Sequence, residues 1–326
     1  MPANAAPMTA PASTATPSTP ASSQASGTPS DSMKPDSMKP ASGRTEVAVL
    51  LVLGSCTSLQ VGAALATRLF PVAGAPGATV LRLGIAAVTL LAITRPRVRA
   101  WTPAQWRAVV LYGVSLAGTN GFFYAALARL PLGTAVTIQF LGPLTLAAAL
   151  SRRWRDGCWV LLALAGVATL GLAGGHSGGG SVRSLDGIGL VFILISAAFW
   201  ALYIVAGSRA SAAVPGRGGL AVAMTVGALA VSPFGAAGSW RVTAHPHLLP
   251  AALGMALLAS VIPYTLELAA LRRAPRRVFG ILLSLEPAVA TVAGFVLLGQ
   301  RTSPAALAAT CVVVAASAGA ALTARR

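Results

Sequence analysis

Apolar residues dominate long blocks of this chain, and short polar stretches separate the blocks. Each block is about 20 residues long, the length that an α-helix needs to cross a hydrocarbon core of about 30 Å. The pattern therefore predicts an all-α integral membrane protein with ten transmembrane helices in a lipid bilayer. The predicted helices cover residues 46–67, 78–94, 105–127, 132–150, 157–174, 186–207, 218–237, 249–270, 277–298 and 304–323.

Residues 1–44 do not share this pattern. They consist mainly of Ala, Pro, Ser and Thr, and they contain the direct repeat DSMKPDSMKP. Such a composition cannot bury enough apolar surface to fold. We expect residues 1–44 to form a disordered tail.

The composition agrees with a membrane protein. Hydrophobic residues make up 55% of the 326 residues and charged residues only 10%, whereas soluble domains carry roughly 25% charged residues. The formal net charge of +17 is also typical of proteins that bind nucleic acids. Here the arginines lie in short clusters between apolar blocks instead of on one folded basic face, so we expect no nucleic-acid partner.

The sequence lacks the signatures of catalysis and of tightly bound cofactors. It contains no Walker loop, no His-Glu-x-x-His motif and no nucleophile elbow. Cys56, Cys158 and Cys311 lie in or at the ends of apolar blocks, where a small packing residue is the expected role. His245 and His247 are spaced to share a metal ion, but we interpret them as solvated loop residues. We predict a protein that is not an enzyme and that uses no cofactor or metal.

The basic residues predict the orientation in the membrane, because Lys and Arg accumulate in cytoplasmic loops. With the N-terminus in the cytoplasm, 18 of the 24 Lys and Arg residues fall in cytoplasmic segments, five fall in outer segments, and one lies inside a helix. The outer five are Arg68, Arg129, Arg183, Arg241 and Arg301, and the one inside a helix is Arg82. Both termini are therefore predicted to be cytoplasmic.

Two segments of the chain resemble each other. YAALARLPLGTAVTIQFLGP (124–143) and LAALRRAPRRVFGILLSLEP (268–287) align at a constant offset of 144 residues. Each half of the chain holds five predicted helices, an odd number, so the second half crosses the membrane inverted relative to the first. The predicted repeats cover residues 45–175 and 185–323. Inverted repeats are a common plan of secondary transporters, whose site lies near the midplane; duplication without transport is the alternative.

A carboxylate, Glu286, interrupts the apolar run LLSLEPAVATVAG (282–294). Its helix enters from the predicted cytoplasmic side near Pro275, and 11 residues at 1.5 Å each place Glu286 roughly 16 Å deep, near the midplane. Because an ionised carboxylate there costs about 3 kcal/mol, we expect Glu286 to bind a cation or take up a proton. The alternative is a buried ion pair with Arg82 that only fixes packing. Gly142, the equivalent residue of the first half, is expected to offer space.

Prolines interrupt both helices that carry these positions. Pro287 cannot donate a hydrogen bond to the carbonyl of Leu283, and Pro143 leaves the carbonyl of Gln139 free in the same way. We predict that the two breaks expose backbone polar groups near the midplane.

Further polar residues at membrane depth are candidates for substrate contact. Arg82 is expected either to snorkel to the outer surface or to bind a carboxylate. Glu267 lies five residues before Arg272, so an interfacial salt bridge and a gating or coupling role both fit. Tyr264 is expected either to pack between helices or to contact a ligand. The candidate binding or coupling residues are Glu286, Glu267, Gln139, Gln60, Arg82, Asn120 and Tyr264, and the candidate helix breaks are Pro143 and Pro287.

Several segments are similar to one known family, the EamA branch of the drug/metabolite transporter superfamily, and in particular to its amino-acid exporters. The resemblance covers the whole membrane region, about 46–323, and omits the tail. The segments that carry it are SLQVGAALATRLFPVAGAPGATVLRLG (58–84), LYGVSLAGTNGFFYAAL (111–127), PLGTAVTIQFLGPL (131–144), ALYIVAGSRA (201–210), IPYTLELAALRRAP (262–275) and RVFGILLSLEPAVA (277–290).

The resemblance implies ten helices in two inverted EamA repeats in the bacterial inner membrane. It implies export of small neutral amino acids, such as threonine and homoserine, in exchange for protons. It also implies a central cavity, to which Glu286, Glu267, Gln139 and Gln60 are the best local matches.

The chain departs from the family at one position. GQRTSP (299–304) stands where the family often has Gly-Glu-x-x-x-Pro, and Gln300 replaces the acid. If that acid takes part in coupling or in an outer gate, these steps differ here. Two other interpretations stay open: export of another small metabolite or drug-like compound, and a membrane scaffold that transports nothing.

Overall fold

The computed structural model describes residues 41–151, 154–173, 186–214, 216–271, 273 and 276–323. Residues 1–40, which form most of the predicted tail, lie outside this part, and the first helix begins at Ala41. The described residues form helices and short connections, with no strand among them. The helices are α1 (Ala41–Thr94), α2 (Pro103–Leu127), α3 (Leu132–Gln139), α4 (Leu141–Leu150), α5 (Trp154–Ala173), α6 (Gly187–Ala213), α7 (Gly218–Thr243), α8 (Leu249–Ala256), α9 (Ile262–Leu271), α10 (Arg276–Leu283), α11 (Glu286–Leu298) and α12 (Pro304–Thr323).

Helix α1 contains both of the first two predicted helices, 46–67 and 78–94. Residues 68–77, expected to be a loop, are helical except at Gly74, whose φ of 67° and ψ of 170° bend the chain. Glycine reaches a positive φ without a steric penalty. Pro76 follows two residues later, and proline is well tolerated in the first turn of a helix. The prediction of a loop was wrong because a single glycine is enough to turn the chain.

The chain is a multi-pass membrane protein. Within the described residues, eight helical stretches are long and apolar enough to cross a membrane, and the first of them, Glu46–Thr94, includes both arms of α1. Gly157–Thr169, inside α5, is a shorter apolar helix. The all-helical membrane fold is thereby confirmed, while the count of ten crossings and the inverted order of the halves stay predictions.

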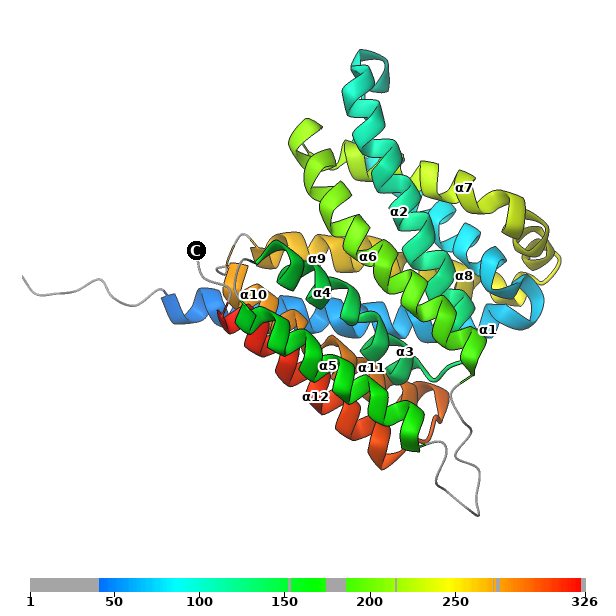
Figure 1. Cartoon of the computed structure of the whole chain (residues 1–326). Helices are drawn as coiled ribbons and strands as arrows, with labels where there is room; N and C mark the ends of the chain where they lie inside the picture. Colours follow the sequence, from blue (N-terminus) through cyan, green and yellow to red (C-terminus); the bar gives the residue numbers. More distant parts are fainter. Residues whose placement is uncertain are drawn as a thin grey trace, which may run out of the picture. The chain divides into compact units, whose positions relative to one another are not determined.

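Helices from the two halves of the sequence pack against each other. Helix α5 lies beside α12, and α2 lies beside α6, as Figure 1 shows. Helix α1 packs against α7, α8 and α9, and α3 packs against α11. The interior between these pairs therefore receives side chains from both halves.

Two helical stretches break at equivalent positions. Helix α3 ends at Gln139 and α4 starts at Leu141, while α10 ends at Leu283 and α11 starts at Glu286. The residues that end α3 and α10 are 144 positions apart, the offset of the sequence repeat. Each break comes three to four residues before a proline, as expected when proline removes a backbone donor.

A third irregularity lies between α8 and α9, where Leu257–Val261 forms a π-helical turn. Such turns are rare, occur mostly as single insertions into α-helices and are frequent at functional sites.

Candidate functional site

A cavity of about 610 Å³ lies among helices of both halves. All seven predicted binding or coupling residues line it, and so does Pro143, whereas Pro287 is not in its wall. The seven come from five helices: Gln60 and Arg82 from α1, Asn120 from α2, Gln139 from α3, Tyr264 and Glu267 from α9, and Glu286 from α11.

Glu286 is the first residue of α11, directly after the break. Its side chain is buried, with 6% of its surface exposed. The amide Nε2 of Gln60 donates a hydrogen bond to Oε1 of Glu286 at 3.3 Å. The other amide atom, Gln60 Oε1, is buried without a hydrogen-bond partner. A carboxylate and an unused carbonyl acceptor thus lie next to each other in the wall.

Arg82 is buried rather than snorkelling, with 5% of its surface exposed. Its Nη2 donates to the carbonyl of Ala259 at 2.7 Å and its Nε donates to Ser260 Oγ at 3.2 Å. Its Nη1 donates to the Tyr124 hydroxyl at 3.3 Å. Ala259 and Ser260 belong to the π-helical turn, so this turn holds the guanidinium in place.

These contacts test the predicted ion pair between Arg82 and Glu286. Both residues lie in the described part of the chain, and no salt bridge joins them. A guanidinium has five N–H donors, and the three hydrogen bonds leave two of them unused. Arg82 therefore keeps two N–H groups that can donate hydrogen bonds to an anionic group in the cavity.

Glu267 lies in the same cavity wall as Glu286. Ser55 Oγ of α1 donates to Glu267 Oε1 at 2.9 Å. No salt bridge of Glu267 occurs among the described residues, and Arg272, its predicted partner, lies outside them. Glu267 thus contributes a second carboxylate to the cavity.

Gln139 and Asn120 use their amide groups within the protein. Gln139 Nε2 donates to Ser196 Oγ of α6 at 2.7 Å, and Ser196 in turn donates to the carbonyl of Thr119 at 2.7 Å. Asn120 Nδ2 donates to the carbonyl of Leu116, one turn earlier in α2. These bonds tie α2, α3 and α6 together around the cavity.

The expected space at Gly142 is not there. A β-carbon at this residue would collide with the carbonyl oxygen of Ala197 in α6. The glycine allows α4 to approach the backbone of α6, so the volume that a side chain would occupy is filled by a neighbouring helix. The two equivalent positions differ in function because one serves packing and the other faces the cavity.

Aromatic rings form much of the remaining wall. The rings of Tyr112 and Tyr203 pack at 5.3 Å between centroids, and Tyr264 lines the same cavity. The lining reaches Ser211 near the C-terminal end of α6 and Phe279 near the start of α10. The cavity therefore extends toward the end of the bundle that we predict to be cytoplasmic.

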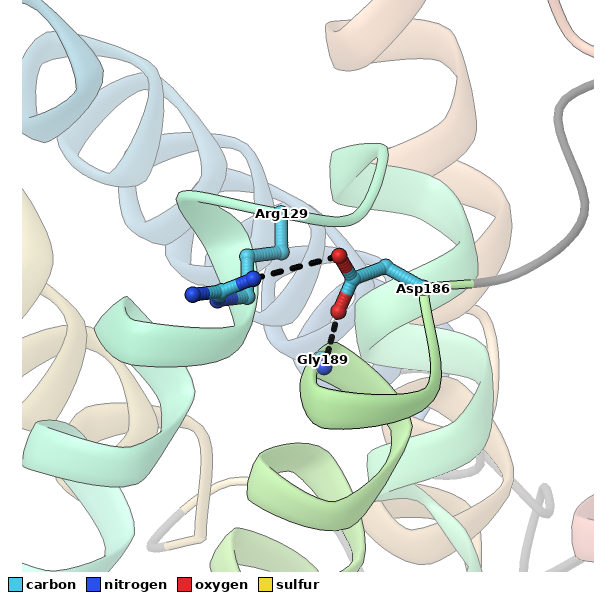
Figure 2. Close-up of polar contacts among 3 residues, drawn as sticks. All are labelled: Arg129, Asp186 and Gly189. Atoms are coloured by element: carbon cyan, nitrogen blue, oxygen red, sulfur yellow. Dashed lines mark hydrogen bonds and ion pairs between the residues drawn. The ribbon is translucent and has the colours of Figure 1, made fainter.

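Two polar contacts hold the turn between α2 and α3. Arg129 Nη1 lies 3.2 Å from Asp186 Oδ2, and the backbone N–H of Gly189 donates to Asp186 Oδ1 at 2.7 Å (Figure 2). The Gly189 N–H, aided by Arg129, holds the pKa of Asp186 below its ordinary value. On the other side, Gln300 Oε1 accepts a hydrogen bond from the backbone N–H of Leu132 at 2.9 Å. Gln300, at the position where the family resemblance predicts an acid, thus caps the start of α3.

Sequence reasoning missed the serines that orient the charged side chains. Ser55, Ser196 and Ser260 bind Glu267, Gln139 and Arg82, respectively. Small polar residues are common at interfaces between membrane helices. This preference could have pointed to serines in general, but it does not predict which serine forms a hydrogen bond with which partner.

The described residues contain no group of three or more His, Cys, Asp or Glu side chains arranged to hold a metal ion. Nδ1 of His245 lies 3.0 Å from the carbonyl of Arg241. Both His245 and His247 are exposed, in agreement with their interpretation as loop residues.

Comparisons with known proteins connect this chain to a family. The family model of the EamA-like transporter family matches residues 187–322. The chain is 38% identical over 292 residues to the threonine/homoserine exporter RhtA of Escherichia coli K12, which covers 90% of this chain and 96% of that protein. It is 39% identical over 278 residues to the protein of the same name from Salmonella typhimurium SL1344, covering 85% of this chain and 92% of that protein.

One solved crystal structure has a similar fold. It superposes with a TM-score of 0.52 at 22% sequence identity and covers 88% of this chain and 99% of that chain. At this identity the likeness extends to the fold alone.

Proposed function

Because this chain belongs to the EamA-like transporter family, we propose that it exports small neutral amino acids, similar to threonine and homoserine, from the cytoplasm in exchange for protons. The observation that carries the proposal is the cavity whose wall contains Glu286, Glu267 and Arg82. A volume of about 610 Å³ suits a small-molecule site, since such sites typically measure about 300–1,000 Å³.

The cavity is complementary to a zwitterion. The ammonium group of an amino acid would bind the Glu286 carboxylate and the free carbonyl Oε1 of Gln60, which lie beside each other. The carboxylate of the amino acid would accept hydrogen bonds from the two unused N–H groups of Arg82. Charge-assisted hydrogen bonds of this kind are about twice as strong as neutral ones.

Glu286 also supplies a coupling step. A proton and the substrate ammonium compete for the same carboxylate, so a proton that arrives from outside displaces the substrate. The empty, ionised carboxylate is unfavourable in a membrane interior and therefore disfavours reorientation without a cation. Such competition is sufficient for antiport and needs no nucleotide.

The predicted inverted repeats supply the moving parts of alternating access. At the offset of 144 residues, the first arm of α1 is equivalent to α6, and α2 is equivalent to the α8–α9 segment. The contact of α2 with α6 and the contact of α1 with α8 and α9 are equivalent under this offset, which supports the predicted repeats. In the predicted orientation, the lining at Ser211 and Phe279 extends toward the cytoplasm, the side from which an exporter loads its substrate.

A second candidate is export of a bulkier, apolar metabolite or drug-like compound. The aromatic rings of Tyr112, Phe140, Trp200 and Tyr203 in the wall favour it. They would stack on a planar solute in a way that a small amino acid cannot use.

Counterflow into vesicles tests the proposal. Purified protein is reconstituted with unlabelled threonine inside, and uptake of labelled threonine is followed with and without a pH gradient. We expect exchange, faster accumulation when protons are supplied on the opposite side, and inhibition by homoserine. A protein that moves aromatic compounds but no amino acid would favour the second candidate, and movement of no solute would favour a scaffold.

Orientation is tested separately by cysteine labelling in a background without Cys56, Cys158 and Cys311. Arg99→Cys lies before α2 and His247→Cys lies before α8, and both native side chains are exposed. We expect an impermeant maleimide to label position 99 only from the cytoplasm and position 247 only from outside. The reverse pattern would overturn the proposal that both termini are cytoplasmic in the bacterial inner membrane, and with it the direction of transport.

A further inference from the structure

Two side-chain polar atoms in the described part of the chain are buried without a hydrogen-bond partner, Gln60 Oε1 and Thr119 Oγ1. Both residues line the cavity. The Gln60 carbonyl lies beside Glu286, where the proposed function uses it for the ammonium group. The Thr119 hydroxyl has no role in that account.

A free hydroxyl on a helix is unusual here. Most threonine hydroxyls on the described helices donate to the carbonyl four residues earlier, as Thr79, Thr137 and Thr225 do. Thr119 could in principle bond to its own helix in the same way, but it does not. An unsatisfied buried hydroxyl costs free energy. A solute in the cavity that formed a hydrogen bond with Thr119 would remove this cost.

The backbone around Thr119 is fixed. Its carbonyl accepts the hydrogen bond of Ser196, and Ser196 is held by Gln139. The next residue, Asn120, bonds to Leu116 within α2. Helix α2 therefore holds Thr119 at a defined place in the wall, with its hydroxyl unpaired.

We propose that Thr119 is a specificity-determining residue whose hydroxyl recognises a side-chain hydroxyl of the transported amino acid. The inference rests on the proposed function and deepens it, because it names the residue that would recognise the side-chain hydroxyl of the substrate. A site built to hydrogen-bond a hydroxyl rejects the isostere that lacks it, since the protein group is then left unpaired. Valine is such an isostere of threonine, and norvaline approximates homoserine.

Competition in the counterflow assay tests the proposal. Labelled threonine is displaced by valine or by unlabelled threonine, and labelled homoserine by norvaline or homoserine. Wild-type protein is expected to prefer each hydroxylated amino acid. Thr119→Val is expected to lower that preference about tenfold, the size of one net hydrogen bond, mainly by weakening binding of the hydroxylated member. Thr119→Ser keeps a hydroxyl and is expected to keep the preference.

Thr225→Val is the matched control, because its hydroxyl already bonds to the carbonyl of Ala221, and it should leave the preference unchanged. Should Thr119→Val fail to reach the membrane, Thr119→Ala compared with Thr119→Ser measures the same hydroxyl. If the wild-type protein exchanges amino acids but the Thr119 variants keep its preference, this inference is overturned while the proposed function stands. If the wild-type protein exchanges no amino acid, both are overturned.

Discussion

The α3–α4 segment and the α10–α11 segment break after equivalent residues, Gln139 and Leu283, but they place different chemistry at the break. In the first, Gln139 bonds to Ser196 and Gly142 packs against the backbone of α6. In the second, the residue equivalent to Gly142 is Glu286, which faces the cavity and meets Gln60. The same backbone plan therefore serves helix packing in one half and places a carboxylate in the cavity wall in the other.

If the two halves are the predicted repeats, this difference allows them to hold an asymmetric solute. Two identical sites would present two like charges to one small molecule. One break carries a carboxylate and the other a neutral amide, so under the proposed function one end of the cavity binds the cation and Arg82 binds the opposite charge. If function follows this asymmetry, substitutions at the two breaks should differ in their effects.

The largest effect is expected at Glu286. Glu286→Gln keeps the size but cannot titrate, so accumulation driven by a pH gradient in vesicles should disappear. Binding of threonine should weaken about 10- to 100-fold, because a hydrogen bond to a charged group contributes about 1.5–3 kcal/mol. Gln139→Met removes a neutral hydrogen bond of the other break and should weaken binding about tenfold at most while accumulation persists.

Glu286→Asp should retain part of the activity, since it still titrates but is one methylene shorter. A Glu286→Gln protein that still builds a threonine gradient would contradict the assigned role. Glu267 would then be the next candidate for coupling, since it is the second carboxylate in the wall.

The next effect concerns the packing role of the first break. Gly142→Ala places a methyl group against the Ala197 carbonyl and should lower the free energy of unfolding by about 1–3 kcal/mol, as overpacking does. The measurement is denaturation of the purified protein in detergent. Gly84→Ala is the matched control, because nothing lies within 4 Å of its β-carbon position. Equal stability of the two variants would show that α4 does not depend on this close approach.

Much of the membrane fold could be predicted from the sequence, because apolar block length directly reports helix crossings. Glu286, Arg82 and Gln60 could be identified as well, since polar residues inside apolar blocks are costly and need a role. The packing role of Gly142 could not be predicted, because the sequence shows only that a side chain is missing and not which neighbour fills the space. The π-helical turn that holds Arg82 was also beyond prediction, since no residue in LLASV (257–261) signals an inserted position.

A smaller effect is expected at the two prolines. Pro287→Ala restores a backbone donor at the break that carries Glu286, and we expect exchange by the protein in vesicles to slow a few-fold while its abundance in the membrane changes less. Pro143→Ala is the mirror experiment at the break that carries Gln139, and it should affect the rate less if only the second break presents the coupling residue. Abundance that falls in step with exchange would mean that the prolines matter for folding alone.

The smallest effect is expected at the turn that leads into α3, where Asp186 binds Arg129 and the Gly189 N–H. Because the folded pKa of Asp186 is lowered, its stabilising contribution is present above the ordinary value of 3.8 and is lost as the pH falls through the folded pKa. Asp186→Asn retains an oxygen for the helix cap but loses the charge. We expect its melting temperature in detergent to lie slightly below that of the wild type at pH 6, with the gap closing toward pH 3. A gap that stays constant over this range would show that the Asp186 charge does not stabilise the approach to the first broken helix.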